Sequence, residues 1–254
     1  MQSIFPTDWG EIEYGEAWER QEAMLAAALY IKRQAADRKA TMGASPELQS
    51  PESGIRNELI FCQHPHVYTL GKSGQPQNLL LSDERMKAID ATFYRTNRGG
   101  DITYHGPGQI VGYPLFDLEQ FRTDLGWYMR SLEEVIIKTI SHYGIQGERL
   151  KGATGVWLDA DDPAKARKIC AMGVRCSRWM TMHGFALNVN TDLAYFGHII
   201  PCGLVDKGVT SMAAETGCAI DEQEVKVQLL EAFAAVFDAD ILPEESRIFL
   251  TAKA

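Results

Sequence analysis

The run Lys168-Ile169-Cys170-Ala171-Met172-Gly173-Val174 begins with a lysine and continues with apolar or small residues. A short apolar run of this kind is typical of a buried β-strand. Because side chains alternate along a strand, we expect Lys168 on the same face as Cys170, Met172 and Val174. A lysine on an apolar face is costly unless it is paired or lies at the end of the strand that meets water. The sequence therefore predicts a strand whose first residue either has a functional partner or reaches solvent.

Segments on both sides of this strand have the periodicity of further strands and helices. Helices are predicted over residues 16–38 and 132–143, and from about residue 221. Strands are predicted over residues 58–62, 67–70, 91–96, 109–114, 155–158 and 180–189. Because these elements do not alternate as regular βαβ units, we expect an α+β fold with a mixed β-sheet and flanking helices. Residues 41–54 are rich in Ser, Pro and Gly and predict a surface loop.

The composition is ordinary for a soluble globular protein, with 45% hydrophobic and 23% charged residues in 254. A net charge of −9 argues against a nucleic-acid partner. No stretch approaches the ~18 apolar residues that a membrane span needs, and the first residues do not form a signal peptide. The five cysteines lack the spacing of a disulfide scaffold. We therefore expect a cytoplasmic protein with free thiols and no membrane partner.

A second stretch, Ile199-Ile200-Pro201-Cys202-Gly203-Leu204, contains a candidate nucleophile. A cysteine attacks only as the thiolate, and a nearby ammonium in a poorly hydrated site favours that form. Lys168 is the cation that we assign to this task. The alternative is a buried structural cysteine, since free cysteine is among the most buried residue types. His198, four residues before Cys202, is a rival partner for a Cys-His pair.

Residues 98–109, with the sequence RGGDITYHGPGQ, hold four glycines in twelve positions. Glycine lets backbone N–H groups approach a ligand closely, Arg98 could bind an anionic or carbonyl group, and His105 could shuttle a proton. The spacing fits neither a P-loop nor a dinucleotide-binding fingerprint. A long, glycine-rich hairpin connection explains the segment equally well. Cys62, His64 and His66 alternate, but one short cluster is weak evidence for zinc, and we expect no metal site.

Taken together, these segments resemble the octanoyltransferases of lipoate biosynthesis, the lipoyl/octanoyl transferase family. The similar blocks are His64-Pro65 with Tyr68-Thr69-Leu70-Gly71, Arg98-Gly99-Gly100 with Thr103-Tyr104-His105-Gly106-Pro107-Gly108-Gln109, Lys168-Ile169 with Met172-Gly173-Val174-Arg175, His183-Gly184-Phe185-Ala186-Leu187-Asn188, and Ile200-Pro201-Cys202-Gly203. They run in the family's order from about residue 58 to 217. The resemblance implies one catalytic domain over residues 1–254, with a fold shared with biotin and lipoate protein ligases.

The resemblance also implies an activity. An octanoyl group would pass from octanoyl-acyl carrier protein, where phosphopantetheine holds it, to a lysine of lipoyl domains. Such domains include the glycine cleavage H protein and the E2 subunits of 2-oxoacid dehydrogenases. Cys202 would be the acyl-thioester nucleophile and Lys168 its activating partner, and neither ATP nor a metal would be required. Substrate would contact Arg98, Gly99, Gly100, Asp101, Ile102, Thr103, Tyr104, His105, Ala171, Met172, Gly173, Gly184, Phe185 and Ala186.

Three other functions compete with this one. A lipoate or biotin ligase would share the implied fold, but it would make an acyl-adenylate from ATP with Mg²⁺ and would need no cysteine nucleophile. A cysteine hydrolase would use His183 or His198 as its base and release the free acid. A module that only binds the carrier protein would have lost the chemistry. Because the implied partners are acidic, we also expect a basic surface near the mouth of the site, formed by Arg175 and Arg178.

Overall fold

The computed structural model describes residues 2–42, 54–200 and 207–242. Within these ranges the main sheet has the strand order β12-β1-β2-β6-β10-β9-β8-β7, and β11 pairs with β9. The strands, in chain order, are β1 (Gln2–Glu11), β2 (Asn57–Gln63), β6 (Gln109–Leu115), β7 (Glu148–Leu150), β8 (Ala153–Leu158), β9 (Arg167–Ser177), β10 (Met180–Asn188), β11 (Gly208–Val209) and β12 (Ala239–Ile241). The β12–β1, β1–β2 and β11–β9 pairs are parallel and the others antiparallel, so the predicted mixed sheet is confirmed.

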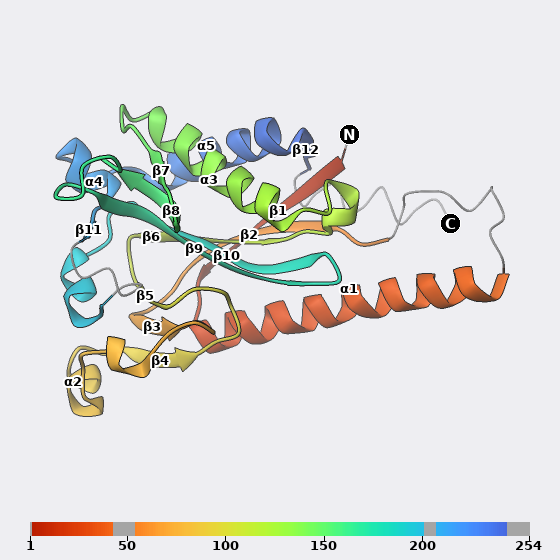
Figure 1. The fold of residues 1–254 in the computed structure, drawn as a ribbon, viewed down its shortest axis with the longest axis horizontal. Helices are drawn as coiled ribbons and strands as arrows, with labels where there is room; N and C mark the ends of the chain where they lie inside the picture. Colours follow the sequence, from red (N-terminus) through yellow and green to blue (C-terminus); the bar gives the residue numbers. More distant parts are fainter. Residues whose placement is uncertain (1, 43–53, 201–206, 243–254) are drawn as a thin grey trace.

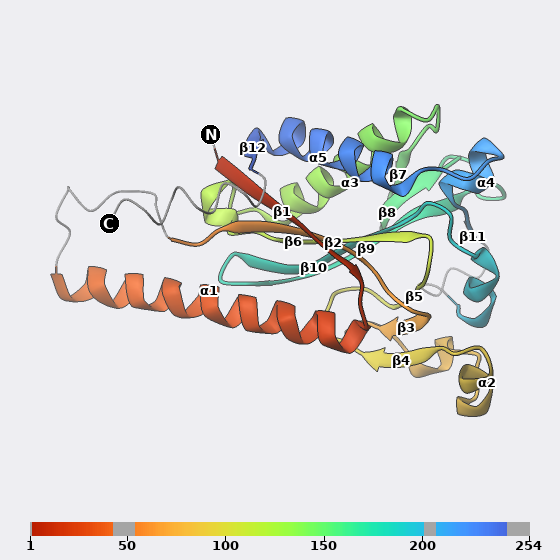
Figure 2. The same ribbon diagram turned by 180° about the vertical axis from the view of Figure 1, so that it is seen from behind.

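Helices cover both faces of the main sheet (Figures 1 and 2). On one face, α3 (Leu125–Ser141) and α5 (Glu222–Phe237) lie side by side and bury an apolar stripe against the strands. On the other face lies the long helix α1 (Tyr14–Met42), which extends beyond the end of the sheet. Asp124 and Asp221 cap α3 and α5 by accepting hydrogen bonds from Trp127 N and Gln223 N. The α+β fold with flanking helices is thus confirmed.

A smaller sheet lies on the α1 side, at the end of the molecule where α1 begins. Its order is β4-β3-β5, from β3 (Val67–Leu70), β4 (Thr92–Arg95) and β5 (Ile102–His105). Short helices lie in the connections between these elements: 3₁₀ helices at Pro76–Asn78, Leu118–Gln120 and Leu193–His198, with α2 (Asp83–Ala88) and α4 (Met212–Thr216). Buried Tyr68, Ile102 and Tyr104 form the core of this sheet. The core fixes β5 and therefore the glycine-rich segment that precedes it.

Several sequence expectations need correction. The glycine-rich connection after residue 96 is not one uninterrupted loop, because it contains β5. The helix predicted from residue 132 begins at Leu125, and β1, β7, β11 and β12 were not predicted. Of the loop expected over 41–54, residues 43–53 lie outside the described residues. Across the ranges that are described, every helix is too short or too polar to cross a membrane.

Candidate active site

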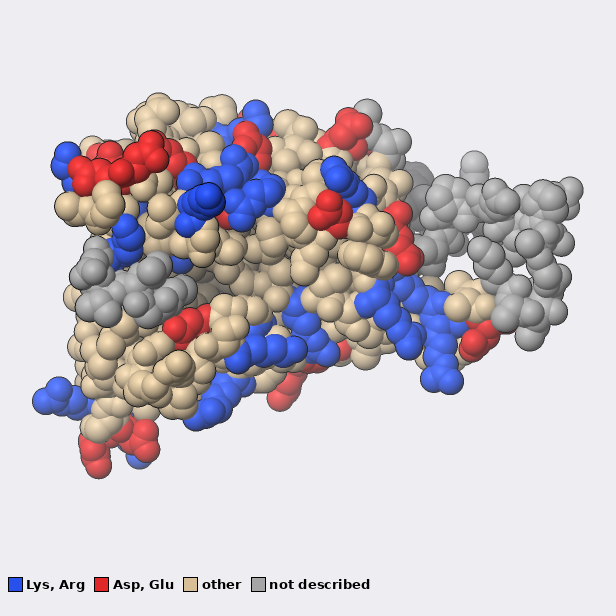
Figure 3. All heavy atoms as spheres, in the orientation of Figure 1, with Lys and Arg blue, Asp and Glu red and all other residues tan. Residues whose placement is uncertain are grey.

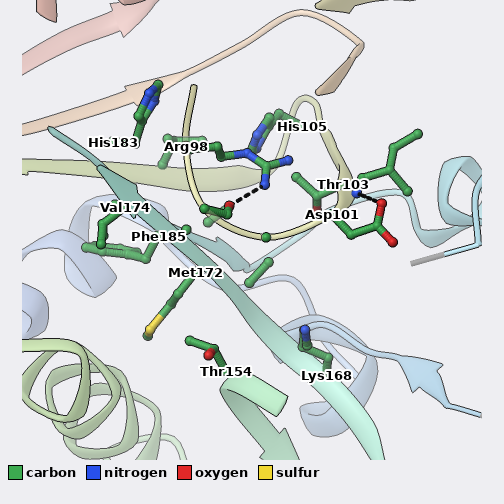
Figure 4. Close-up of a pocket in the computed structure, with 18 of the residues that line it drawn as sticks. Arg98, Asp101, Thr103, His105, Thr154, Lys168, Met172, Val174, His183 and Phe185 are labelled. Carbon is green, nitrogen blue, oxygen red and sulfur yellow. Dashed lines mark hydrogen bonds between the residues drawn. The ribbon is translucent and has the colours of Figure 1, made fainter. Parts of the chain in front are cut away.

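A cavity of about 410 Å³ lies between the glycine-rich segment and strands β9 and β10 (Figure 4). Most residues that the sequence placed beside substrate line this cavity: Arg98, Gly99, Gly100, Asp101, Ile102, Thr103, His105, Lys168, Ala171, Met172, Gly173, Gly184, Phe185 and Ala186. Segments from three distant parts of the chain therefore meet at one place. Their contact with substrate stays a prediction.

Tyr104 is the exception among the residues expected to contact substrate. It does not line the cavity, although its neighbours Thr103 and His105 do. Successive side chains of a strand point to opposite faces, so β5 sends Tyr104 into the core of the small sheet. There its ring stacks on Tyr195 at 5.0 Å, and its hydroxyl lies 2.7 Å from His66 Nδ1. Tyr104 therefore supports the wall of the cavity from behind.

Lys168 reaches the cavity because the pairing of β8 with β9 is irregular. Val156 pairs with Cys170 but Trp157 pairs with Lys168, so β9 has one extra residue, Ile169, at this point. The extra residue breaks the two-residue alternation on which the sequence argument depended. Cys170 is fully buried in the core beneath α3 and α5, whereas Lys168 lies beside Trp157 at the cavity. The expectation that Lys168 and Cys170 share a face was therefore wrong.

Beyond Cys170, β9 no longer pairs with β8, and the cavity runs along this unpaired edge of β9. The glycine-rich segment approaches this edge, where Gly99 N donates to Val174 O at 2.9 Å. The approach is close enough to require glycine at position 173, because a Cβ there would lie 2.6 Å from Gly99 O. Gly173 and Gly99 thus permit the two walls of the cavity to meet.

Arg98 is buried, and its guanidinium fixes the glycine-rich segment. Its Nη2 donates to Thr69 O at 2.7 Å and to Thr69 Oγ1 at 2.9 Å. Its Nη1 donates to Gly99 O at 2.9 Å, the bond drawn at Arg98 in Figure 4. Because a neutral carbonyl or hydroxyl bonds more strongly to a charged donor, these contacts rigidify the segment. Arg98 therefore has a structural task, and its positive charge also lies at the cavity.

The histidines at the cavity are buried and neutral. Burial, followed by the neighbouring His64, lowers the pKa of His105 to about 3. Burial, followed by Arg98, lowers the pKa of His183 to about 3. A neutral imidazole cannot serve as the cation that stabilises a thiolate. Among the described residues lining the cavity, this leaves that task to lysine or arginine.

Each of the two histidines has a defined hydrogen-bond partner. The ring of His105 donates from Nδ1 to Gln109 Oε1 at 2.8 Å, and that of His183 donates from Nε2 to Asn97 Oδ1 at 2.7 Å. His183 also has a positive φ of 58° within β10, an uncommon conformation for a residue with a side chain. His198, the other candidate partner for a thiol, is half-buried and is not among the described residues that line the cavity.

Cys202 lies outside the described residues, but both flanks of its segment are placed. On one side, Ile200 N donates to Asn78 O at 2.8 Å. On the other, Gly208 and Val209 pair with Arg167 and Lys168 as β11. Phe196, Lys207, Gly208 and Val209 all line the cavity. The chain therefore reaches and leaves the undescribed segment 201–206 beside the cavity that contains Lys168.

Cys62 and His64 lie together, with 3.6 Å between Cys62 Sγ and His64 Nε2, but His66 lies apart from them. His64 donates from Nδ1 to Ile12 O at 2.7 Å and accepts at Nε2 from the Tyr113 hydroxyl at 2.6 Å. His66 belongs to the small sheet, where its ring stacks on Tyr195 at 4.1 Å. Among the residues described, no group of three His, Cys, Asp or Glu side chains could hold a metal ion. That no metal takes part stays a prediction.

The basic surface expected from Arg175 and Arg178 is not at the cavity. Arg178 follows the far end of β9 from Lys168, a separation of roughly 30 Å at about 3.3 Å per strand residue. Arg175 forms an ion pair with Glu22 of α1, with 2.7 Å between Nη1 and Oε1. On the face shown in Figure 3, lysines and arginines form several separate groups interspersed with acidic residues. Neither arginine lines the cavity among the described residues, although Arg175 follows Val174, which does.

Sequence reasoning missed several residues that line the cavity, among them Tyr14, Gln109, Met129, Trp157 and Asn188. Gln109 connects two of the predicted blocks, because its amide donates to Asn188 Oδ1 at 2.8 Å. Trp157 could have been found only by knowing the register shift between β8 and β9. Tyr14 is the first residue of α1, and helical periodicity predicts only that it is buried in the core, not that it lines a cavity.

Comparison with known proteins agrees with this geometry. The lipoyl protein ligase A/B catalytic domain family matches residues 42–234. An octanoyltransferase of Cytophaga hutchinsonii is 48% identical, over 94% of this chain and 94% of its own. One of Christiangramia forsetii is 53% identical over 90% of this chain and 93% of its own.

Solved structures resemble the fold. A bi-partite lipoate protein ligase of Thermoplasma acidophilum has a TM-score of 0.66 at 14% identity, covering 96% of this chain and 86% of its own. A lipoate-protein ligase A bound with ATP has a TM-score of 0.64 at 15% identity, covering 96% and 89%. At such identities the likeness concerns the fold alone, and it confirms the expected relation to lipoate ligases. By sequence, this chain belongs to the lipoyl protein ligase A/B catalytic domain family, among its octanoyltransferases, and is an acyltransferase.

Proposed function

We propose that this chain transfers an octanoyl group from octanoyl-acyl carrier protein to a specific lysine of lipoyl domains, through a thioester on Cys202. The acceptors are the glycine cleavage H protein and the E2 subunits of 2-oxoacid dehydrogenases, and the reaction takes place in the cytoplasm. The names of the curated relatives support octanoyl transfer. The donor, the acceptors and the covalent intermediate are extensions that the chemistry of the site favours.

One observation carries the proposal. Lys168 lies at the wall of the cavity, and the residues on both sides of segment 201–206 line the same cavity. Val209, seven residues after Cys202, pairs directly with Lys168, and Thr210 N donates to Lys168 O at 2.9 Å. A short segment anchored at both ends has a limited reach, since consecutive Cα atoms are about 3.8 Å apart. The placed flanks of the segment therefore support the proposal that the Cys202 sulfur meets the ammonium that would keep it ionised.

The reaction would proceed in two balanced steps. The Cys202 thiolate attacks the thioester carbonyl of the donor, a C–S bond forms, and the pantetheine thiolate leaves and takes up a proton. The neutral amine of the acceptor lysine then attacks the acyl-enzyme, and the Cys202 thiolate leaves as the amide forms. The proton lost by that amine passes to water or through Lys168. Backbone N–H groups of the glycine-rich segment or beside Cys202 would stabilise the oxyanion in both steps.

The cavity suits a medium-length acyl chain. Its volume is about 410 Å³, and Met172, Val174 and Phe185 give it apolar walls (Figure 4). Burying six methylenes at about 0.8 kcal/mol each contributes about 5 kcal/mol before the cost of ordering the chain. That is enough to hold an octanoyl tail while the reacting thioester lies near the charged side chains.

We propose that neither ATP nor a metal ion takes part. Exchange of one thioester for another is close to balanced, so no separate activation of the acid is needed. The lipoate ligases of the same fold include one solved with ATP, and an ATP requirement would therefore identify the alternative function. A hydrolase is disfavoured because the neutral His183 has its Nε2 bonded to Asn97 and its pKa lowered to about 3.

The decisive experiment is intact-mass analysis after mixing the protein with octanoyl-acyl carrier protein, without ATP. We expect an octanoyl adduct in the wild type and in Cys218→Ser, whose thiol is exposed, and none in Cys202→Ser. Lys168→Met should form the adduct slower by orders of magnitude, whereas Lys138→Met, a control at an exposed lysine of α3 outside the cavity, should form it near the normal rate. An adduct that persists in Cys202→Ser, or octanoate release without acceptor, would contradict the proposal.

A further inference from the structure

The ammonium of Lys168 lies over an aromatic ring outside the predicted set of site residues. Its Nζ is 4.6 Å from the centroid of the Trp157 ring, and Trp157 is 2% exposed. An ammonium within about 6 Å of a ring centroid is attracted by the negative π face, tryptophan is the best such partner, and exclusion of water strengthens the attraction. The contact therefore favours the positive form of Lys168 at the wall of the cavity.

The irregular pairing of β8 and β9 creates this contact. With regular alternation after the Val156–Cys170 pair, Trp157 would face Ile169, but the extra residue brings Trp157 opposite Lys168. Side chains of directly paired residues lie close together on one face of a sheet. The register shift thus performs two tasks: it turns Lys168 away from the core and brings its ammonium over the indole.

The indole is itself held in place. Its Nε1 donates to Ala153 O at 3.2 Å, which fixes the orientation of the ring. Two residues before Trp157, Gly155 N donates to Glu133 Oε1 of α3 at 3.1 Å. The Glu133 carboxylate is fully buried and accepts from Arg130 Nη1 at 2.8 Å and Arg149 Nε at 3.1 Å. A buried carboxylate with two arginine partners therefore anchors the strand that carries the ring.

We propose that Trp157 is a positioning residue for acyl transfer, which holds Lys168 as an ammonium ion over its ring at the wall of the cavity. Trp157 acts through Lys168 and need not touch the acyl group itself. The effect of Trp157 on catalysis rests on the function proposed for Lys168, whereas its effect on the charge of Lys168 does not. The two can therefore be measured separately.

The direct test is competitive labelling with acetic anhydride across pH 7 to 11, resolved by peptide mass spectrometry, with exposed Lys151 as internal reference. Only the neutral amine reacts, so the pH midpoint of labelling reports the stability of the ammonium form. We expect Trp157→Leu to lower the Lys168 midpoint by about 0.4 to 1.5 pH units, and Trp157→Phe, which keeps a weaker π face, to lower it by less. Trp127→Phe is the control, since Trp127 packs against Phe237 and does not line the cavity.

A change in accessibility alone would scale labelling at every pH and leave the midpoint in place, which would overturn the inference. A lowered midpoint together with octanoyl-adduct formation slower by about twofold to thirtyfold would support both the inference and the proposed function. A lowered midpoint with normal adduct formation would establish the contact but refute the role of Trp157 in acyl transfer; the role of Lys168 itself is tested separately by Lys168→Met. If Trp157→Leu does not fold, the Trp157→Phe midpoint decides the question.

Discussion

Acidification provides a quantitative test of the buried polar region beneath the cavity. His64, His105 and His183 are 0%, 7% and 2% exposed, and burial is the largest cause of the low pKa of each. Their pKa values are lowered from 6.5 to about 4, 3 and 3. The unfolded chain therefore takes up protons near pH 6.5 that the folded chain does not. Stability should be complete above pH 6.5 and fall as the pH falls below it.

The magnitude follows from linkage between protonation and folding. At pH 5.0 an unfolded histidine with a pKa of 6.5 gains about 2 kcal/mol by protonation, and a folded one with a pKa of 4 or less gains almost nothing. Three such residues give a loss of about 6 kcal/mol between pH 7.5 and 5.0, comparable with the whole stability of many domains. Carboxylates contribute little in this window because they titrate mainly below it.

Urea unfolding at 25 °C, followed by far-UV circular dichroism at half-unit steps of pH, measures this loss. His64→Gln should reduce the dependence on pH by about a third, whatever its own stability. His142→Gln, which removes an exposed histidine at the end of α3, should leave the dependence unchanged. A free energy of unfolding that stays constant within about 1 kcal/mol from pH 7.5 to 5.0 would refute the burial of these histidines as neutral groups.

Three further predictions concern single side chains. Glu133→Ala should lower the free energy of unfolding, measured by urea titration, by about 3 to 5 kcal/mol. Glu133→Gln should lower it by less, because the amide oxygen can still accept the hydrogen bond from the β8 backbone. Equal losses in the two variants would argue against that hydrogen bond. Gly173→Ala should lower the free energy of unfolding by about 1 to 3 kcal/mol, because the new Cβ would lie 2.6 Å from a carbonyl oxygen. Gly197→Ala should leave it unchanged in the same assay, because no atom lies within 4 Å of the new Cβ. Cys218 is exposed and should react with maleimide in the native protein. Cys170 is fully buried, and burial raises the pKa of its thiol, so it should react only in denaturant. Rapid labelling of Cys170 in the native protein would contradict its placement in the core.

The elements of this fold that sequence periodicity predicted are those with long or strongly apolar patterns. The long N-terminal helix, β3 and the helix after Asp221 were found close to their true bounds because buried residues recur there at regular spacing. β5 was missed because it has only four residues between glycine-rich turns. β11 and β12 are two and three residues long and owe their conformation to the strands beside them, which a local pattern cannot show.

For the candidate site, the motif blocks identified the cavity better than they identified each residue's part in it. The blocks include Arg98, His105, Lys168 and Phe185, which all line the cavity. They could not show that Tyr104 faces away, because that depends on which face of β5 meets the small sheet. They also could not show the contact of Lys168 with Trp157, because the register shift that produces it is a property of two paired strands.

The extra residue in β9 has a consequence for how this chain tolerates change in length. Deleting Ile169 would leave Val156 opposite Cys170 and Trp157 opposite Lys168, now as neighbouring pairs of a regular ladder, so the lysine would stay at the cavity. A one-residue deletion at this site would therefore remove a fully buried isoleucine from the core without altering any residue that lines the cavity. The extra residue lets two consecutive side chains of β9, Ile169 and Cys170, enter the core while the cation beside them stays on the side of the cavity.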